Sequence, residues 1–171
     1  GMRLHISRLS LLLVVNQLRS KKYAIYESGN TYMKIVVLGG GSFGTAIANM
    51  LAENGQQSVL WLRNAERAAA MRANRENNTY LPGRKLDEEL DISSDLAGSL
   101  RDANVVFVSV PSKAFRAMVQ QIKPLLMPDA IVVSTAKGIE TGVDHHGFWL
   151  MSDVLKQELP DHRIAVLSGP N

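Results

Sequence analysis

Three glycines near residue 40 have the spacing of a phosphate-binding turn. Gly39, Gly41 and Gly44 form the pattern G-x-G-x-x-G between an apolar segment, Lys34–Leu38, and a segment of helical periodicity, Ser42–Asn54. In such a turn the first glycine permits the bend out of the strand, the second lets a pyrophosphate approach the backbone, and the third lets the helix pack close to the sheet. The helix N-terminus then offers unpaired N–H groups to the phosphates. The pattern predicts a dinucleotide site; the alternative is a flexible turn that binds nothing.

The residue after the second apolar segment bears on which dinucleotide binds. A site for NAD usually has an Asp or Glu there, about 20 residues after the glycines, to accept hydrogen bonds from the ribose. The segment Ser58–Leu62 is followed instead by Arg63, whose guanidinium suits the 2′-phosphate of NADP. Arg67 adds charge one helical turn later, and Asn64 has an amide for a ribose hydroxyl. We predict that NADPH is preferred over NAD, with dual use still open. The alternative is that Arg63 is a solvated surface residue.

Three further segments are expected at the same edge of a sheet. They are Val110–Ser112, Ala136–Glu140 and Ser168–Asn171, each of which follows an apolar segment. Ligands of open parallel sheets bind outside the carboxyl ends of the strands, where small residues bring backbone donors close to a ligand. Lys137 is the one cation at the end of its strand, and it is suited to bind an anionic substrate or to polarise a carbonyl. The alternative for Lys137 is a solvated loop lysine.

Strands and helices alternate along the chain from Met33 onward. The expected strands are Lys34–Leu38, Ser58–Leu62, Asp91–Ile92, Asn104–Val110, Ala130–Ser134 and Arg163–Leu167. The expected helices are Ser42–Asn54, one capped by Asn64 and ending near Arg75, Asp95–Arg101, Lys113–Lys123 stopped by Pro124, and Phe148–Glu158, with a loop over Asn77–Leu90. Apolar strands separated by helices indicate a mostly parallel sheet covered on both faces. The predicted fold class is α/β, a doubly wound sheet of the Rossmann type.

Residues 1–32 differ in character from the rest of the chain. They combine a short apolar run, Leu9–Val15, with a basic patch and a polar stretch, and Met33 then stands directly before the first strand. The apolar run is much shorter than the roughly 20 residues that cross a bilayer, and no convincing cleavage site follows it. We therefore expect residues 1–32 to be an extension outside the fold and residues 33–171 to be the dinucleotide-binding domain.

Composition excludes several classes of function. The 171 residues are 46% hydrophobic and 20% charged, which is ordinary for a soluble globular domain. The absence of cysteine excludes disulfides, thiolate catalysis and cysteine zinc sites. The net charge of +3 comes without a basic stripe or a recognition motif, so we expect no nucleic-acid partner. Because the adjacent His145 and His146 do not point at one ion, we expect no metal site.

Five blocks of residues, in order over 34–171, resemble bacterial NAD(P)-dependent glycerol-3-phosphate dehydrogenases. The blocks are Gly39–Ala46 followed by Val59–Trp61, Asn77–Gly83, Val110–Ser112, Lys137–Glu140 and Ser168–Asn171. The resemblance implies reduction of dihydroxyacetone phosphate to glycerol 3-phosphate with hydride from NAD(P)H, in the cytoplasm, for glycerophospholipid supply. It does not cover residues 1–32.

The resemblance also implies roles for individual residues. It implies cofactor contacts for Ser42, Phe43, Arg63, Asn64, Tyr80 and Lys137. The glycine motif and the sheet edge add Gly39, Gly41, Gly44 and Pro111 to the expected cofactor-binding residues. Lys137 is expected to be shared with the substrate, and Gly169 and Asn171 are expected in the substrate loop. Asn171 stands where the family often has Ser or Thr.

The family carries its catalytic lysine in a helical C-terminal domain, and this chain ends at Asn171. No catalytic residue is therefore assigned here, and we expect the chain to bind cofactor but to turn over poorly or not at all by itself. We expect no membrane partner and consider a homodimer for the full-length enzyme. Two alternatives remain: another two-domain dehydrogenase, of the 6-phosphogluconate or ketopantoate type, and a nucleotide-binding module without catalysis.

Overall fold

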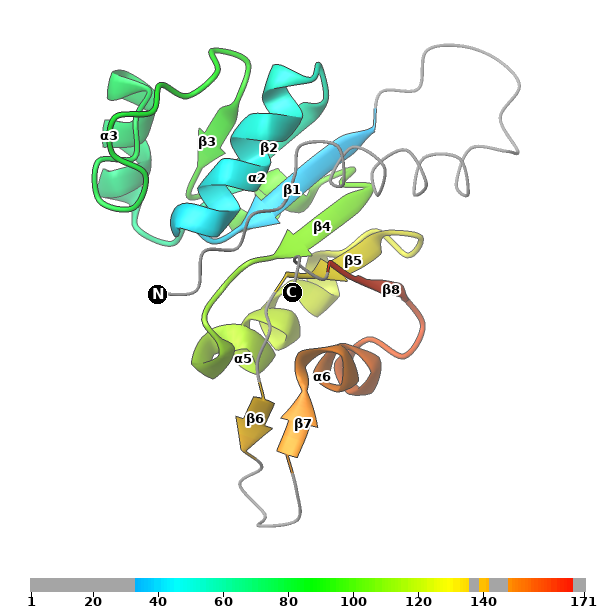
Figure 1. The fold of residues 1–171 in the computed structure, drawn as a ribbon. Coiled ribbons are helices and arrows are strands. Elements are labelled where there is room, and N and C mark those ends of the chain that lie inside the picture. Colours follow the sequence, from blue (N-terminus) through cyan, green and yellow to red (C-terminus); the bar gives the residue numbers. More distant parts are fainter. Residues whose placement is uncertain (1–32, 136–138, 142–147, 168–171) are drawn as a thin grey trace, which may run out of the picture.

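A computed structural model describes residues 33–135, 139–141 and 148–167 (Figure 1). Its centre is a sheet of six strands in the order β3-β2-β1-β4-β5-β8, and every pair of neighbours is parallel. The strands are β1 (Lys34–Leu38), β2 (Gln57–Trp61), β3 (Asp91–Ser93), β4 (Val105–Val108), β5 (Ile131–Ser134) and β8 (Arg163–Val166). The chain starts at β1, moves outward to β3, and returns to the other side of β1 with β4. This order confirms the predicted doubly wound fold.

Both faces of the sheet are buried under helices. These are α2 (Ser42–Glu53), α3 (Ala65–Asn74), α4 (Leu96–Leu100), α5 (Ser112–Ile122) and α6 (Met151–Glu158). Because successive strand residues point to opposite faces, Ile35 and Val37 of β1 pack into one core with α2 and α3, whereas Val36 and Leu38 pack into the other with α5 and α6. Each fully buried side chain of this size contributes about 1.5–3 kcal/mol, so the two cores hold the strand ends firmly in place.

One segment expected to be helical is divided between a strand and a helix. Residues Phe148–Glu158 were predicted as one helix, but the structure has β7 (Phe148–Leu150) followed by α6. β7 pairs antiparallel with β6 (Ile139–Thr141), so that Ile139 lies opposite Leu150. The prediction of helix is therefore wrong for the first three residues. The aromatic residues Phe148 and Trp149 are compatible with a strand. The partner strand, which local periodicity does not reveal, decides the outcome.

The helix expected to stop at Pro124 ends slightly earlier. α5 ends at Ile122 and is followed by a short 3₁₀ helix, η1 (Lys123–Leu125), that contains the proline. Proline lacks a backbone N–H and fits the first positions of a helix better than its interior, so the chain starts a new turn there rather than continuing α5.

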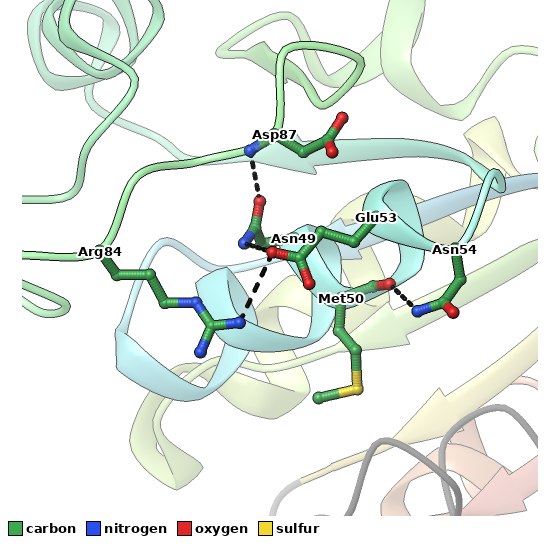
Figure 2. A network of polar contacts seen from close by, with 6 residues as sticks. All are labelled: Asn49, Met50, Glu53, Asn54, Arg84 and Asp87. Carbon is green, nitrogen blue, oxygen red and sulfur yellow. Dashed lines mark hydrogen bonds and ion pairs between the residues drawn. The ribbon is translucent and has the colours of Figure 1, made fainter.

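The loop between α3 and β3 is held by polar contacts with α2 (Figure 2). Asn49 is fully buried in α2; its Oδ1 accepts a hydrogen bond from the N–H of Asp87 at 2.6 Å, and its Nδ2 donates to Glu53 at 3.0 Å. Glu53 also faces Arg84, with 3.6 Å between Oε1 and Nη2. These contacts keep the loop against α2, and Leu86 reaches the core from it.

Some expectations fall on residues outside the described part of the chain. These include the extension over residues 1–32 and the pair His145 and His146. Within the described residues, no group of three or more His, Asp or Glu side chains is placed to hold a metal ion. None of the described helices has the length and apolar content needed to cross a membrane.

Candidate functional site

The glycine-rich turn lies where the strand order of the sheet reverses. β1 lies between β2 and β4 (Figure 1). From β2 the sheet continues to β3 at one edge, and from β4 it continues through β5 to β8 at the other edge. The N–H of Gly39 donates to the carbonyl of Trp61 at the end of β2, at 2.9 Å. The N–H of Ser109 donates to the carbonyl of Leu38 at the end of β1, at 2.8 Å. The turn and the end of β4 therefore border one crevice, at the position where ligands bind in this topology.

The surroundings of the three glycines of the motif differ in what a side chain at each position would meet. Gly39 has a φ of 121°, and a Cβ there would overlap the carbonyl group of Ser109. A Cβ on Gly44 would overlap the carbonyl oxygen of Gly39, so the third glycine lets α2 pack on the turn itself. A Cβ on Gly41 would meet nothing within 4 Å. Gly41 therefore borders open space, which is what a ligand that approaches the backbone requires.

Two helices begin beside this crevice without a side-chain cap. α2 follows Gly41 and α5 follows Pro111, and neither N-cap residue makes a side-chain capping bond. Neither helix has an acidic residue in its first turn. The first N–H groups of a helix have no intrahelical acceptor and carry a partial positive charge. This arrangement favours an anion at the crevice.

A cavity of about 380 Å³ opens in the crevice, within the range of small-molecule sites. Its described lining residues are Gly39, Gly40, Gly41, Trp61, Leu62, Arg63, Asn64, Arg67, Tyr80, Ser109, Val110, Pro111, Ala114 and Met118. One wall is apolar and comes from the end of β4 and from α5. A second wall comes from the end of β2, the start of α3 and the loop that carries Tyr80.

Positive charge lines the second wall. The exposed Arg63 follows β2, and the half-buried Arg67 lies in the first turn of α3. Arg67 donates to the carbonyl of Gly40 at 3.2 Å, and its guanidinium carbon lies 5.0 Å from the centre of the Tyr80 ring. No carboxylate stands among the described residues that line the cavity. The wall is therefore suited to a phosphate group.

The structure brings most of the predicted cofactor residues to this cavity. Gly39, Gly41, Arg63, Asn64, Tyr80 and Pro111 line it. Ser42, Phe43 and Gly44 form the first turn of α2 and do not line it themselves. Lys137, Gly169 and Asn171 lie outside the described residues.

Asn64 has a structural role in addition to its place at the cavity. As predicted, it is the N-cap of α3, and its Oδ1 accepts a hydrogen bond from the N–H of Arg67 at 2.9 Å. The cap uses one lone pair of the oxygen, and the amide nitrogen is suited to donate a hydrogen bond to a ligand.

Several features of the site were not predicted as site features. Ala114 and Met118, one helical turn apart on α5, form part of the apolar wall. The helical periodicity after Pro111 is the signal that could have identified this face. Trp61, predicted as a packing residue, is buried and also lines the cavity; its Nε1 has no hydrogen-bond partner among the described residues. Asn77, identified from the sequence only as part of a block shared with the family, donates a hydrogen bond to the glycine-rich turn.

Residues 34–171 match the family model described as NAD-dependent glycerol-3-phosphate dehydrogenase N-terminus. The chain belongs to this family. It is 52% identical over 139 residues to the glycerol-3-phosphate dehydrogenase [NAD(P)+] of Teredinibacter turnerae, which covers 81% of this chain and 40% of that protein. It is 50% identical over 146 residues to the enzyme of the same name from Saccharophagus degradans, covering 85% of this chain and 40% of that protein. The chain thus spans about two-fifths of the length of these curated relatives.

Solved structures of glycerol-3-phosphate dehydrogenases have the same fold. The enzyme from Coxiella burnetii is 34% identical and superposes with a TM-score of 0.74, over 82% of this chain and 42% of that one. The enzyme from Saccharomyces cerevisiae is 26% identical with a TM-score of 0.72, over 82% of this chain and 43% of that one. A ketopantoate reductase from Ralstonia eutropha is 23% identical with a TM-score of 0.58, which shows a shared fold alone.

Proposed function

We propose that this chain is the NAD(P)H-binding part of a glycerol-3-phosphate dehydrogenase, which reduces dihydroxyacetone phosphate to glycerol 3-phosphate. The proposal rests on one observation, the cavity at the glycine-rich turn, where Gly41 borders open space and α2 begins without a side-chain cap. Relatives named glycerol-3-phosphate dehydrogenase [NAD(P)+] support the reaction. When bound, the cofactor supplies the hydride; the residues described here bind and orient it.

The residues of the cavity fit a dinucleotide. Gly41 and the first turn of α2, which includes Ser42 and Phe43, would hold the pyrophosphate. The apolar wall formed by Pro111 and α5 would cover the adenine ring, because such a ring loses water most favourably against apolar side chains. Arg63 and Arg67 would bind a 2′-phosphate on the second wall. The charge of this wall, with no described carboxylate, supports the preference for NADPH over NADH.

The substrate end of the proposal depends on the family resemblance. We assign Lys137 to both cofactor and substrate, and Gly169 and Asn171 to the substrate loop. A lysine is a suitable partner for the phosphate or the carbonyl of dihydroxyacetone phosphate. On the same grounds we propose residues 33–171 as the dinucleotide-binding domain, the cytoplasm as its location and a homodimer as the full-length assembly.

A titration tests the cofactor assignment directly. NADPH and NADH are added separately to the folded chain, and binding is followed by calorimetry and by the nicotinamide fluorescence. We expect saturable binding of both, with the lower Kd for NADPH. If folded protein binds neither compound, the proposed function is wrong. If NADH binds more tightly, the function stands and the proposed role of the two arginines is wrong.

A further inference from the structure

Asn77 is a buried amide at the start of the loop after α3. It is 1% exposed and does not line the cavity. Its Nδ2 donates to the carbonyl of Gly40 and to Oγ1 of Thr45, both at 2.9 Å. Its Oδ1 accepts a hydrogen bond from the N–H of Tyr80 at 3.2 Å. Both amide hydrogens and the amide oxygen of Asn77 are therefore used, which connects this loop to the glycine-rich turn.

The carbonyl of Gly40 receives two hydrogen bonds. One comes from Asn77 and the other from Arg67. In a planar trans peptide the C=O and N–H point in opposite directions, so a carbonyl turned toward Asn77 turns the N–H of Gly41 to the other side of the turn. Gly41 is the residue whose Cβ position is open. Asn77, which does not line the cavity, thus sets the direction of the N–H of Gly41, which does line it.

This peptide needs an external restraint because of its sequence. It is flanked by glycine on both sides, in the run Gly39-Gly40-Gly41. Glycine has access to both signs of φ at little steric cost, so a peptide between glycines is free to rotate unless its carbonyl or N–H is held. The hydrogen bonds to the Gly40 carbonyl provide that restraint.

The contacts of Asn77 form a closed circuit around the cavity wall. Asn77 binds Gly40, Gly40 accepts from Arg67, Arg67 lies over the ring of Tyr80, and the N–H of Tyr80 returns to Asn77. Three of these four residues line the cavity, and only Asn77 does not. The side chain of Asn77 thus connects two segments that both contribute residues to the cavity.

We propose that Asn77 is a positioning residue that orients the Gly40–Gly41 peptide toward the pyrophosphate of the bound dinucleotide. The proposal rests on the cofactor site proposed above. The loop has supports of its own: the N–H of Leu81 donates to the Asn77 carbonyl at 2.9 Å, and Arg67 remains over Tyr80. Removing the Asn77 side chain therefore affects the peptide orientation more than the arginine-bearing wall.

The test compares ligands with and without a pyrophosphate on the variant Asn77→Ala. NADPH and NADH are titrated directly, and ADP and adenosine 2′-monophosphate are titrated as competitors of NADPH. We expect Kd to rise about tenfold for NADPH, NADH and ADP, which corresponds to the loss of about one well-placed hydrogen bond. Binding of adenosine 2′-monophosphate, which has no pyrophosphate, is expected to change less than about twofold.

Controls separate positioning from a loss of stability. The matched variant Asn78→Ala alters the exposed neighbour and is expected to bind all four ligands as the parent does. Titrations are made well below the midpoint of thermal unfolding. If Asn77→Ala does not fold, Asn77→Ser takes its place, because the shorter side chain cannot reach Gly40, Thr45 and Tyr80 together.

Two outcomes overturn the proposal. One is a folded Asn77 variant that binds ADP and NADPH as tightly as the parent. The other is an equal loss for all four ligands, which would indicate a general loosening of the cavity and no specific role at the pyrophosphate. Failure of the parent protein to bind NADPH and NADH would instead refute the cofactor site itself.

Discussion

The backbone of Gly39 lies directly against the carbonyl group of Ser109, at the junction of β1 and β4. A Cβ on Gly39 would overlap the Ser109 carbonyl oxygen and would lie 2.8 Å from its carbonyl carbon. The two residues are far apart in the sequence but share the crevice where the strand order reverses. The first glycine of the motif is therefore required by tertiary packing as well as by its own φ of 121°.

The first prediction concerns the stability effect of this contact. Gly39→Ala is expected to lower the free energy of unfolding by about 2–4 kcal/mol, because the methyl group meets rigid backbone and the positive φ disfavours alanine. Urea denaturation measures the change. Gly55→Ala is the matched control, since Gly55 has a φ of 77° but nothing within 4 Å of its Cβ position. Its cost is expected to be only about 1–2 kcal/mol. Equal costs at the two positions would contradict the steric argument.

The second prediction separates binding from stability at Gly41. Its φ is −73° and its Cβ position is open, so Gly41→Ala is expected to change the free energy of unfolding by less than about 0.5 kcal/mol. The methyl group would, however, occupy the space proposed for the pyrophosphate. We expect Kd for both NADPH and NADH to rise by about tenfold or more. Unchanged cofactor affinity in a stable Gly41→Ala protein would show that the pyrophosphate lies elsewhere.

The third prediction tests cofactor preference. Arg63→Gln removes the exposed guanidinium at the end of β2 and should raise Kd for NADPH about tenfold, since hydrogen bonds to charged groups contribute about 1.5–3 kcal/mol. Kd for NADH should change less than about twofold. Arg72→Gln is the control: Arg72 lies on the same helix as Arg67, but donates to the carbonyl of Ile92 at 2.7 Å and is not among the residues lining the cavity. A parallel loss for NADPH and NADH in Arg63→Gln would argue against 2′-phosphate recognition.

The fourth prediction concerns how the stability of the contact between α5 and α6 depends on pH. The hydrogen bond from Arg116 to Oε1 of Glu158, at 2.7 Å, lowers the pKa of Glu158 below its usual 4.5, and Gln120 adds a second hydrogen bond at 3.1 Å. Burial opposes this shift of the pKa. Because the folded-state pKa is lowered, the stabilisation is present above pH 4.5 and is lost as the pH falls through the folded-state pKa.

The variant Glu158→Gln tests this dependence. Its free energy of unfolding should fall below that of the parent by about 0.5–1 kcal/mol at neutral pH, and the difference should shrink in acid. Urea denaturation of the variant and the parent, at neutral pH and in acid, measures this difference. The exposed Glu88 provides a control, since Glu88→Gln is expected to stay within about 0.5 kcal/mol of the parent at both. A Glu158→Gln deficit that is the same in acid would refute the assignment.

The fifth prediction addresses the contacts between α2 and the loop shown in Figure 2. Asn49→Ala leaves the N–H of Asp87 without its side-chain acceptor and should lower the free energy of unfolding by about 1–3 kcal/mol. Glu53→Gln weakens only the exposed contact with Arg84 and retains an oxygen for Asn49, so its cost should be under about 1 kcal/mol. Chemical denaturation of both variants decides, and a larger cost for Glu53→Gln would reverse the proposed ranking.

Local sequence was sufficient for most of the elements and for the position of the glycine-rich turn. The bounds of β1 were predicted exactly, as was the capping of α3 by Asn64, because a continuous apolar strand and a capping side chain act on their own neighbours. The parallel doubly wound order followed from the alternation of strands and helices. The spacing of glycines and the guanidinium after β2 indicated a dinucleotide, and the ordered blocks indicated the family.

Tertiary structure alone decided which distant residues meet. No local periodicity indicated that Ser109 would lie against Gly39, that Asn77 would hold the Gly40 carbonyl, or that β6 would make a strand of Phe148–Leu150. Apolar residues that recur every two or 3.6 positions indicate which face of an element is buried. A glycine indicates which backbone conformations are allowed at its own position. Neither signal indicates which distant residue a given residue will contact, because these contacts form only when the two cores pack and bring the strand ends together.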